Sequence, residues 1–303
     1  MKYAMLPEYW DGVDKALSAE GCELTQDLGE AEFLVYNGSA ANFPELPENI
    51  RWVQLTIAGI DAFFDAGIIT DERRWSNASK IYGRTVAESA MGLLLAQLHH
   101  HPRITRAKSW EVRDELDHTT TYLLDSTVAI LGAGGIGEAM VPMLKAFGCR
   151  VIAVNRSGRD VAGADVTYPT EQIDRAYAEA DHFVVAAPHT AATHHMINAE
   201  SLAKMHPHSV VVNVGRGPLV DTEALIEALE HGTIAGAGLD VTEPEPLPES
   251  SPLWGMDNVV ITPHVANTIG SIQHRMGPAA VANFKAWQAG ETMPTEVTPA
   301  NGY

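Results

Sequence analysis

The chain has few cysteines, few basic side chains and no long apolar run. Cys22 and Cys149 are too few for a disulfide scaffold and fit a reducing compartment, so we expect a cytoplasmic protein. A membrane helix needs about 18 apolar residues, and the nearest candidate, Met91–Leu98, is too short. The first residues contain no apolar signal core before their acids and proline. We therefore expect neither a membrane protein nor one secreted through a signal peptide.

The shortage of basic residues decides the charge. Lys and Arg together number 20 against 39 acidic residues, which gives a formal net charge of −19. No run of like charge stands out, so the acids form a dispersed, solvated surface that favours solubility. Because nucleic-acid phosphates require a basic face, we expect no nucleic-acid partner. The apolar share of 46% is that of a folded globular chain.

Short apolar runs alternate with helical patterns along the whole chain. This order predicts α/β structure, with parallel sheets covered by helices on both faces. Helices are predicted at 85–100, 137–147, 222–231 and 272–290 from their apolar spacing. Strands are predicted at 32–36, 51–55, 127–131, 150–154, 182–186, 209–214, 235–239 and 258–262.

The polar, charged stretch Arg103–Thr121 indicates a domain boundary, because it precedes the strongest predicted strand. A chain of 303 residues also suggests two domains. We therefore expect a smaller unit over residues 1–101 and a second domain over 102–267. The C-terminal segment 268–303 is expected to return to the first unit as a helix.

A glycine-rich loop follows the first strand of the second domain. It consists of Gly132, Gly134, Gly135, Ile136 and Gly137, and a helical pattern and another strand come after it. The Gly-x-Gly-x-x-Gly pattern alone is weak, and this context strengthens it. Gly132 would allow the tight turn, Gly134 the approach of a pyrophosphate, and Gly137 the packing of helix on strand. We predict a Rossmann dinucleotide-binding domain.

The end of the next strand indicates which dinucleotide binds. About twenty residues past the glycine loop, an NAD enzyme has Asp or Glu for the ribose hydroxyls, whereas Asn155 stands there in this chain. Arg156, Ser157 and Arg159 supply the two cations and the hydroxyl that suit a 2′-phosphate. The alternative is two solvated arginines, with Arg159 paired to Asp160. We favour NADP (NADPH) over NAD as the cofactor.

Three chemically versatile residues, Arg216, Glu245 and His264, follow later predicted strands, where ligands of open α/β sheets bind. Each alone is more typical of a surface arginine, a loop glutamate or a packed histidine. Together they suit reduction of a 2-oxo acid by hydride transfer. Arginine would grip the carboxylate, histidine would protonate the carbonyl oxygen, and glutamate would orient the histidine and favour its charged form. Asp240, also past a strand, is a further cofactor-binding candidate.

These residues belong to longer segments whose order and spacing form a pattern. The segments are Val128–Gly137, Asn213–Asp221, Gly238–Pro248 and Ile261–His264. With them the chain resembles the D-isomer-specific 2-hydroxyacid dehydrogenases over nearly its whole length. The resemblance implies Arg216 as substrate anchor, His264 as acid/base and Glu245, rather than Glu243, as the partner of His264. It also implies two doubly wound parallel-sheet domains, the Rossmann domain being inserted into a flavodoxin-like substrate domain.

The resemblance extends to residues outside the glycine loop and the catalytic set. The segment around Ile57, Ala58 and Gly59 is similar to the family's substrate loop, whose backbone N–H groups bind the carboxylate. Pro188 matches a proline in the loop that follows a strand of the nicotinamide domain. Trp110 resembles an aromatic residue that in some members lies near the substrate across a dimer interface. A homodimer through the nucleotide domain is implied in the same way.

The run Asn155–Arg159 is most similar to the NADPH-using glyoxylate/hydroxypyruvate reductases. We therefore expect NADPH-dependent reduction of glyoxylate or hydroxypyruvate to the D-2-hydroxy acid, with His264 as acid/base. Two alternatives stay open: a D-2-hydroxyacid dehydrogenase for a bulkier 2-oxo acid, and a dinucleotide-sensing interaction protein of corepressor type.

Histidines cluster at three places along the chain. Adjacent positions of a helix point about 100° apart, so His99–His101 cannot all face one metal. The pairs His194/His195 and His206/His208 have no Cys or acidic partner at ligand spacing. We therefore predict no metal site.

Overall fold

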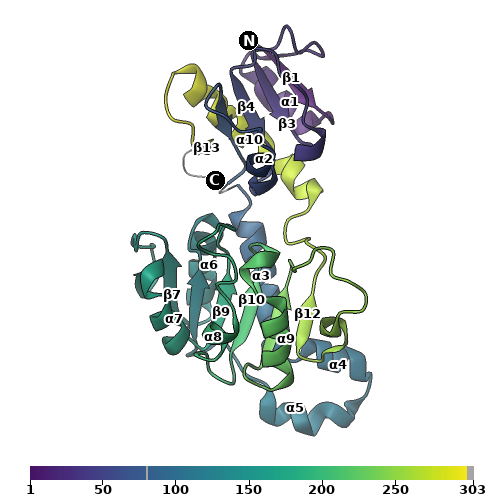
Figure 1. Cartoon of the computed structure of the whole chain (residues 1–303), viewed down its shortest axis with the longest axis vertical. Helices are drawn as coiled ribbons and strands as arrows, with labels where there is room; N and C mark the ends of the chain where they lie inside the picture. The colour runs from purple at the N-terminus through teal and green to yellow at the C-terminus, as the bar shows by residue number, and fades with distance from the viewer. Residues whose placement is uncertain (80, 299–303) are drawn as a thin grey trace. The chain divides into compact units, whose positions relative to one another are not determined.

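The chain, described here from a computed structural model, divides into two compact units (Figure 1). The structure describes residues 1–79 and 81–298, so the last residues of the predicted C-terminal segment, 299–303, lie outside the described part. Unit 1 combines the N-terminal segment up to Tyr82 with the segment from Asn267, and unit 2 runs from Gly83 to Ala266. The predicted insertion of one domain into the other is thus confirmed.

The first boundary lies at residues 82/83, earlier than the expected 101/102. Helix α3 (Gly83–Leu98) belongs to unit 2 because its buried face packs on the sheet of that unit. The side-chain amide of Gln97 donates a hydrogen bond to the carbonyl of Ala237 at 2.7 Å. Leu93 packs against Gly238, where a Cβ would lie 2.9 Å from the Cβ of Leu93. The apolar pattern predicted this helix but did not indicate which sheet it covers.

Unit 2 is built on a parallel sheet in the order β12-β11-β10-β9-β6-β7-β8. From β6 onward this is the Rossmann order 3-2-1-4-5-6 with one further strand. Within this sheet, β8 was not predicted, and every other strand overlaps its prediction. The strands are β6 (Thr127–Leu131), β7 (Arg150–Asn155), β8 (Val166–Pro169), β9 (His182–Val185), β10 (Val210–Asn213), β11 (Gly236–Leu239) and β12 (Val259–Ile261).

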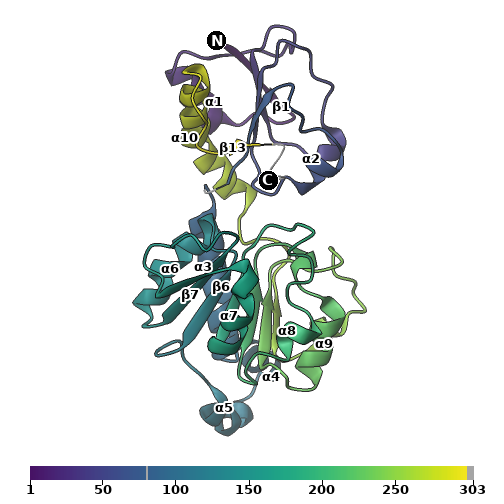
Figure 2. The same ribbon diagram turned by 60° about the vertical axis from the view of Figure 1, so that its left-hand side comes forward.

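Helices cover both faces of this sheet (Figure 2). Side chains of β6 alternate between two cores: Val128 and Ile130 pack in the core with α3 and α6, while Ala129 and Leu131 pack in the core with α7, α8 and α9. Burial on both faces explains why the strands read as continuous apolar runs. The covering helices are α6 (Gly135–Ala146), α7 (Ile173–Glu179), α8 (Ala199–Leu202) and α9 (Thr222–Glu230).

Unit 1 contains a six-stranded sheet in the order β13-β5-β4-β3-β1-β2. The five parallel strands follow the flavodoxin-like order 2-1-3-4-5, as expected. The edge strand β13 pairs antiparallel with β5, so this sheet is not purely parallel. The strands are β1 (Lys2–Leu6), β2 (Glu23–Leu24), β3 (Phe33–Tyr36), β4 (Trp52–Leu55), β5 (Arg74–Ser76) and β13 (Glu296–Val297).

Each face of this sheet packs on its own helices. Phe33 of β3 stacks on Trp52, 4.8 Å between ring centroids, and lies 5.6 Å from Phe284 of α10 (Ile269–Gln288). On the other face, Leu34 shares a core with Phe63 of α2 (Asp61–Asp65). Helix α1 (Asp11–Ala19) packs along α10, which returns the chain to this unit as predicted.

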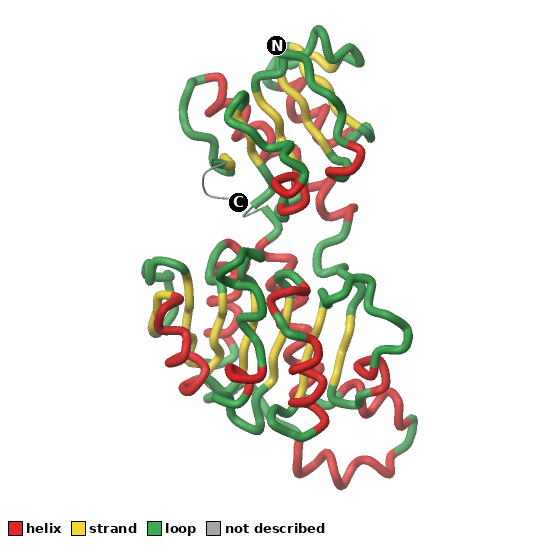
Figure 3. Tube along the Cα trace, in the orientation of Figure 1, coloured by secondary structure: helices red, strands yellow, loops and turns green. Residues whose placement is uncertain are grey.

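Residues 101–119 form a helical arm that projects from unit 2, visible as helices below its sheet in Figure 3. The arm comprises α4 (His101–Ala107), the short helix η2 (Trp110–Val112) and α5 (Arg113–Thr119). Sequence reasoning interpreted this polar stretch as a connection between domains. None of the helices in the described part of the chain is long and apolar enough to span a membrane.

A buried histidine makes the stability of unit 2 dependent on pH. His182 begins β9, is 2% exposed, and accepts a hydrogen bond from the Val210 N–H at its Nδ1. Burial lowers its pKa from 6.5 to about 4, against the attraction of Asp181. Between these values the unfolded chain binds a proton that the folded chain does not, so the free energy of unfolding falls as pH falls.

We expect the free energy of unfolding, measured in urea, to fall by about 2 kcal/mol between pH 7 and pH 4.5 because of His182. The His182→Asn variant should lack this component, whereas the exposed-site control His231→Asn should retain it. Parallel pH profiles for His182→Asn and the unmodified protein would contradict the assignment.

Candidate active site

The glycine loop lies between β6 and α6, where packing requires Gly132 and leaves little room for a side chain at Gly137. Gly132 has a φ of +96°, and a Cβ there would collide with the backbone of Ala187. At Gly137 a Cβ would lie 3.0 Å from a methyl carbon of Ile130. At Gly134 no protein atom lies within 4 Å of the Cβ position. Protein packing therefore does not require the second glycine, and the open space in front of it suits the approach of a pyrophosphate to the helix N-terminus.

The loop after β9 lies against the glycine loop, as the close approach of Ala187 to Gly132 shows. Strands β6 and β9 are neighbours in the sheet, and the strand order reverses there, where ligands of such sheets bind. Pro188 follows directly, and its carbonyl accepts a hydrogen bond from the Thr193 hydroxyl at 2.7 Å. The predicted loop proline thus directly follows a residue that contacts the glycine loop.

The loop after β7 is organised by Asn155. Its side-chain oxygen accepts the N–H groups of Ser157 at 3.2 Å and Arg159 at 3.0 Å, and its amide donates to the Arg159 carbonyl at 2.7 Å. The side chain of Arg159 pairs with Glu138 of α6 at 2.7 Å, rather than with the carboxylate of Asp160. Asn155 therefore shapes the loop, and Arg156 and Arg159 are both exposed on it.

Arg216 lies in a turn that follows β10. The buried Asn213 holds this turn, because its side chain accepts the Gly215 N–H at 3.1 Å and donates to the Arg216 carbonyl at 2.9 Å. Gly217 is required because a Cβ would collide with the Thr242 carbonyl of the neighbouring loop. The Arg216 turn and the Glu245 loop are therefore in direct contact.

Glu245 and His264 come together as predicted: Oε1 of the glutamate lies 2.6 Å from Nδ1 of the histidine. Both side chains are about half exposed in this structure, at 43% and 50%. The contact leaves Nε2 of His264 as the ring atom that can exchange a proton with a substrate. Arg216 follows β10, Glu245 follows β11 and His264 follows β12. These strands lie side by side and run parallel, so the three residues lie at the carboxyl end of the sheet.

Asp240 holds the loop that carries His264. Its carboxylate is 3% exposed and accepts the Thr262 hydroxyl at 2.5 Å and the N–H groups of Val265 and Ala266 at 3.0 Å. The backbone of His264 has a φ of +54°, a strained conformation for a residue with a side chain. These bonds fix that conformation, a role that sequence reasoning missed. The predicted contact of Asp240 with the cofactor stays a prediction.

Glu243 is paired elsewhere, with His195, whose Nε2 lies 2.7 Å from its carboxylate. The backbone carbonyl of Glu243 also accepts the Thr222 hydroxyl at 2.6 Å. We predicted no metal site because the His194/His195 pair has no acidic partner at ligand spacing in the sequence. The fold supplies one from a distant loop, so this premise does not hold.

The candidate substrate loop lies in unit 1, between β4 and α2. Its carbonyl groups are engaged: Ile57 accepts the Ala78 N–H at 2.9 Å, and Ala58 accepts the Asn77 side chain at 3.1 Å. Within the described residues, no hydrogen bond engages the N–H groups of Ile57, Ala58 and Gly59. These amides are thus available to an anion. No sequence signal pointed to Asn77, which is brought to the loop by the pairing of β4 and β5.

Trp110 is 88% exposed on the arm. The arm lies at the amino-terminal end of the sheet, away from the strand ends that carry Arg216 and His264 (Figures 1 and 2). Within a single chain the structure does not bring Trp110 to these residues.

Comparison with known proteins identifies the family. Residues 88–266 match the family described as "D-isomer specific 2-hydroxyacid dehydrogenase, NAD binding domain". A Corynebacterium melassecola protein described as "Uncharacterized protein in proB 3'region" is 51% identical over the full length of both chains. The glyoxylate/hydroxypyruvate reductase B of Pectobacterium carotovorum is 35% identical over 79% of this chain and 75% of its own.

A solved structure extends the similarity to the whole fold. The D-isomer specific 2-hydroxyacid dehydrogenase from Xanthobacter autotrophicus Py2, in complex with NADPH and MES, is 29% identical with a TM-score of 0.84. The match covers 100% of this chain and 99% of the other. The resemblance in the sequence motifs is thereby confirmed. The chain is an NAD(P)-dependent oxidoreductase and belongs to the D-isomer specific 2-hydroxyacid dehydrogenase family.

Proposed function

We propose that this protein reduces a small 2-oxo acid, glyoxylate or hydroxypyruvate, to the D-2-hydroxy acid with NADPH. The observation that carries the proposal is the 2.6 Å pair of His264 and Glu245. Glu245 follows β11 and His264 follows β12, and β11 lies next to β10, the strand that precedes Arg216. A paired histidine and an arginine at one sheet edge can supply a proton and a carboxylate anchor. The relative from Pectobacterium carotovorum, named as a glyoxylate/hydroxypyruvate reductase, supports this substrate class.

The proposed chemistry assigns each side chain one task. The bound dinucleotide supplies a hydride to the carbonyl carbon of the substrate. Arg216 holds the substrate carboxylate through its guanidinium fork. His264, protonated at Nε2, donates that proton to the carbonyl oxygen as negative charge develops there. Glu245 accepts the Nδ1–H and so fixes the ring orientation and stabilises its positive charge.

The open space at Gly134 and the N-terminus of the 12-residue helix α6 suit the pyrophosphate of either cofactor. The choice of NADPH depends on the loop after β7, where no acidic residue occupies the position of Asn155. Arg156, Ser157 and Arg159 are all exposed and are the candidates for the 2′-phosphate, and Arg159 also pairs with Glu138. The related Xanthobacter enzyme was crystallised with NADPH, which supports this choice.

We expect Arg156→Ala to weaken NADPH binding about 30-fold and to leave NADH binding nearly unchanged, because only NADPH carries the 2′-phosphate. Fluorescence titration with each cofactor measures both constants. Arg150→Ala, at the other end of β7 and paired with Glu179, is a matched control that should alter neither. An equal loss for both cofactors would rule out a role in recognising the phosphate.

Initial rates test the proposed activity itself. NADPH and NADH are each offered with glyoxylate, hydroxypyruvate and a branched, bulkier 2-oxo acid. Turnover of the two small acids with a preference for NADPH supports the proposal. Turnover of the bulky acid alone would favour the alternative dehydrogenase. Tight cofactor binding without turnover of any acid would favour a dinucleotide-sensing protein.

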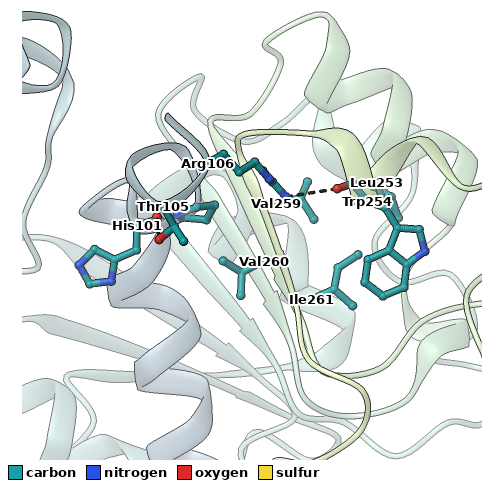
Figure 4. Close-up of a pocket in the computed structure, with 9 residues that line it drawn as sticks. His101, Thr105, Arg106, Leu253, Trp254, Val259, Val260 and Ile261 are labelled. Carbon is teal, nitrogen blue, oxygen red and sulfur yellow. Dashed lines mark hydrogen bonds between the residues drawn. The ribbon is translucent and has the colours of Figure 1, made fainter. Parts of the chain in front are cut away.

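We further propose that the protein is a cytoplasmic homodimer that associates through unit 2. Both cysteines are free and buried, as suits a reducing compartment. The arm exposes Trp110, and beside α4 lies an apolar hollow that is lined by Trp254 and β12 and crossed by Arg106 (Figure 4). Such unpartnered apolar surface is typical of an interface. A mass in solution of twice 32.7 kDa would support the dimer.

A further inference from the structure

A cluster of metal-ligating side chains, one of them on the same loop as Glu245, takes no part in the proposed chemistry. It consists of His194 and His195, from the loop after β9, and Glu243, from the loop after β11. One ligand atom from each of the three lies within 4.8 Å of the others. The two imidazole rings are stacked, with centroids 3.9 Å apart, and Nε2 of His195 lies 2.7 Å from the Glu243 carboxylate.

We propose that His194, His195 and Glu243 form a binding site for a borderline divalent cation, with zinc as the best-suited ion. Two imidazole nitrogens and one carboxylate oxygen are a donor set that zinc accepts, with water as the fourth ligand. Imidazole also suits Co²⁺ and Ni²⁺, whereas Mg²⁺ and Ca²⁺ prefer sites made only of oxygen ligands. The site therefore selects transition-metal ions by ligand type.

The present geometry needs only side-chain adjustment to close around an ion. Zinc–nitrogen and zinc–oxygen bonds are about 2.0–2.2 Å, so ligands of a tetrahedral site lie about 3.4 Å apart. The His195–Glu243 distance of 2.7 Å must open slightly, and the widest separation, up to 4.8 Å, must shorten. His194 is exposed, and the side chains of His195 and Glu243 are 33% and 35% exposed, so an ion can reach the site from solvent.

Neighbouring groups can orient both imidazoles, as is usual around bound metals. Nδ1 of His194 lies 3.2 Å from Nε2 of His189, so a hydrogen bond there leaves Nε2 of His194 to bind the ion. Nδ1 of His195 faces the carboxylate of Asp221 at 3.9 Å. The carboxylates of Asp221 and Glu243 bring negative charge to the site. The imidazoles are neutral when they bind metal, so this charge favours a cation.

Calorimetric titration of the full chain with ZnCl₂ at pH 7.5 tests this proposal without any measurement of turnover. We expect one zinc ion to bind per chain with micromolar affinity. His194→Ala should weaken this binding at least 100-fold, while the His195–Glu243 hydrogen bond persists. Glu243→Gln, which preserves side-chain volume, should give a comparable loss. Melting temperatures without zinc establish that both variants are folded.

The double variant His206→Ala/His208→Ala is the matched control. These histidines also stack, at 5.2 Å, and His208 lies beside Asp181 at 2.8 Å. Unchanged zinc binding in the control, with loss in the two site variants, supports the site. Equal weakening in all three variants would mean non-specific binding to surface histidines and would overturn it, as would the absence of zinc binding. The absorption of bound Co²⁺ adds a second readout, since a tetrahedral site gives an intense visible band that His194→Ala should remove.

Discussion

The His264→Asn variant should reduce its 2-oxo acid substrate about 10³-fold more slowly, with NADPH binding nearly unchanged. Asparagine can still fill the space and donate a hydrogen bond, but it cannot deliver a proton to the carbonyl oxygen. The Asp240 carboxylate would continue to hold the backbone of this loop, since its partners are the Thr262 hydroxyl and two backbone N–H groups. The loss should therefore appear in kcat rather than in folding.

Steady-state rates and cofactor titration of the same preparation separate these effects. Glu245→Gln keeps a polar partner at His264 but removes the charge, so kcat should fall by a smaller factor, about 10- to 100-fold. A control variant, His206→Asn, replaces a histidine outside the site and should be fully active. If His264→Asn retained more than a tenth of the activity, His264 could not be the acid.

The second large effect is expected for Arg216→Ala, which should lower kcat/KM by about 10²- to 10³-fold. The guanidinium would make two charge-assisted hydrogen bonds to the substrate carboxylate, and alanine makes none. Arg216→Lys should recover only part of the loss, because an ammonium group cannot provide the planar fork. The turn itself should survive, since Asn213 holds it through the backbone of Gly215 and Arg216.

Rates at varied substrate concentration and an independent NADPH titration measure this prediction. Arg175→Ala is a suitable control, because Arg175 lies on α7 over the ring of Tyr168, 4.2 Å from its centroid, outside the candidate site. Loss of NADPH affinity in Arg216→Ala that matched the loss in kcat/KM would argue against substrate anchoring. It would indicate a cofactor contact or a displaced glycine loop instead.

Sequence patterns predicted those structural features that depend on residues close together in the chain. The buried strands of unit 2 appeared as continuous apolar runs because both of their faces are covered. The glycine loop was visible because the positive φ and the close packing at Gly132 admit no side chain. The Glu245–His264 pair was predicted from the resemblance, because the order and spacing of its segments are characteristic of the family.

Tertiary structure decided the features that depend on residues far apart in the chain. Apolar spacing predicted α3, but only its packing against the second sheet assigned it to unit 2. The return of the chain as β13, antiparallel to β5, left no periodic signal in a strand of two residues.

The sequence by itself thus determined the fold class, the family and the candidate residues, because apolar periodicity and short motifs are properties of neighbouring positions. Only the folded chain decided how those residues are held. The Asp240 carboxylate holds the backbone of the His264 loop, and the Asn77 side chain holds the candidate substrate loop. It likewise placed Glu243 against His195. These contacts are made by polar groups that find their hydrogen-bond partners through burial and strand order, which no local pattern records.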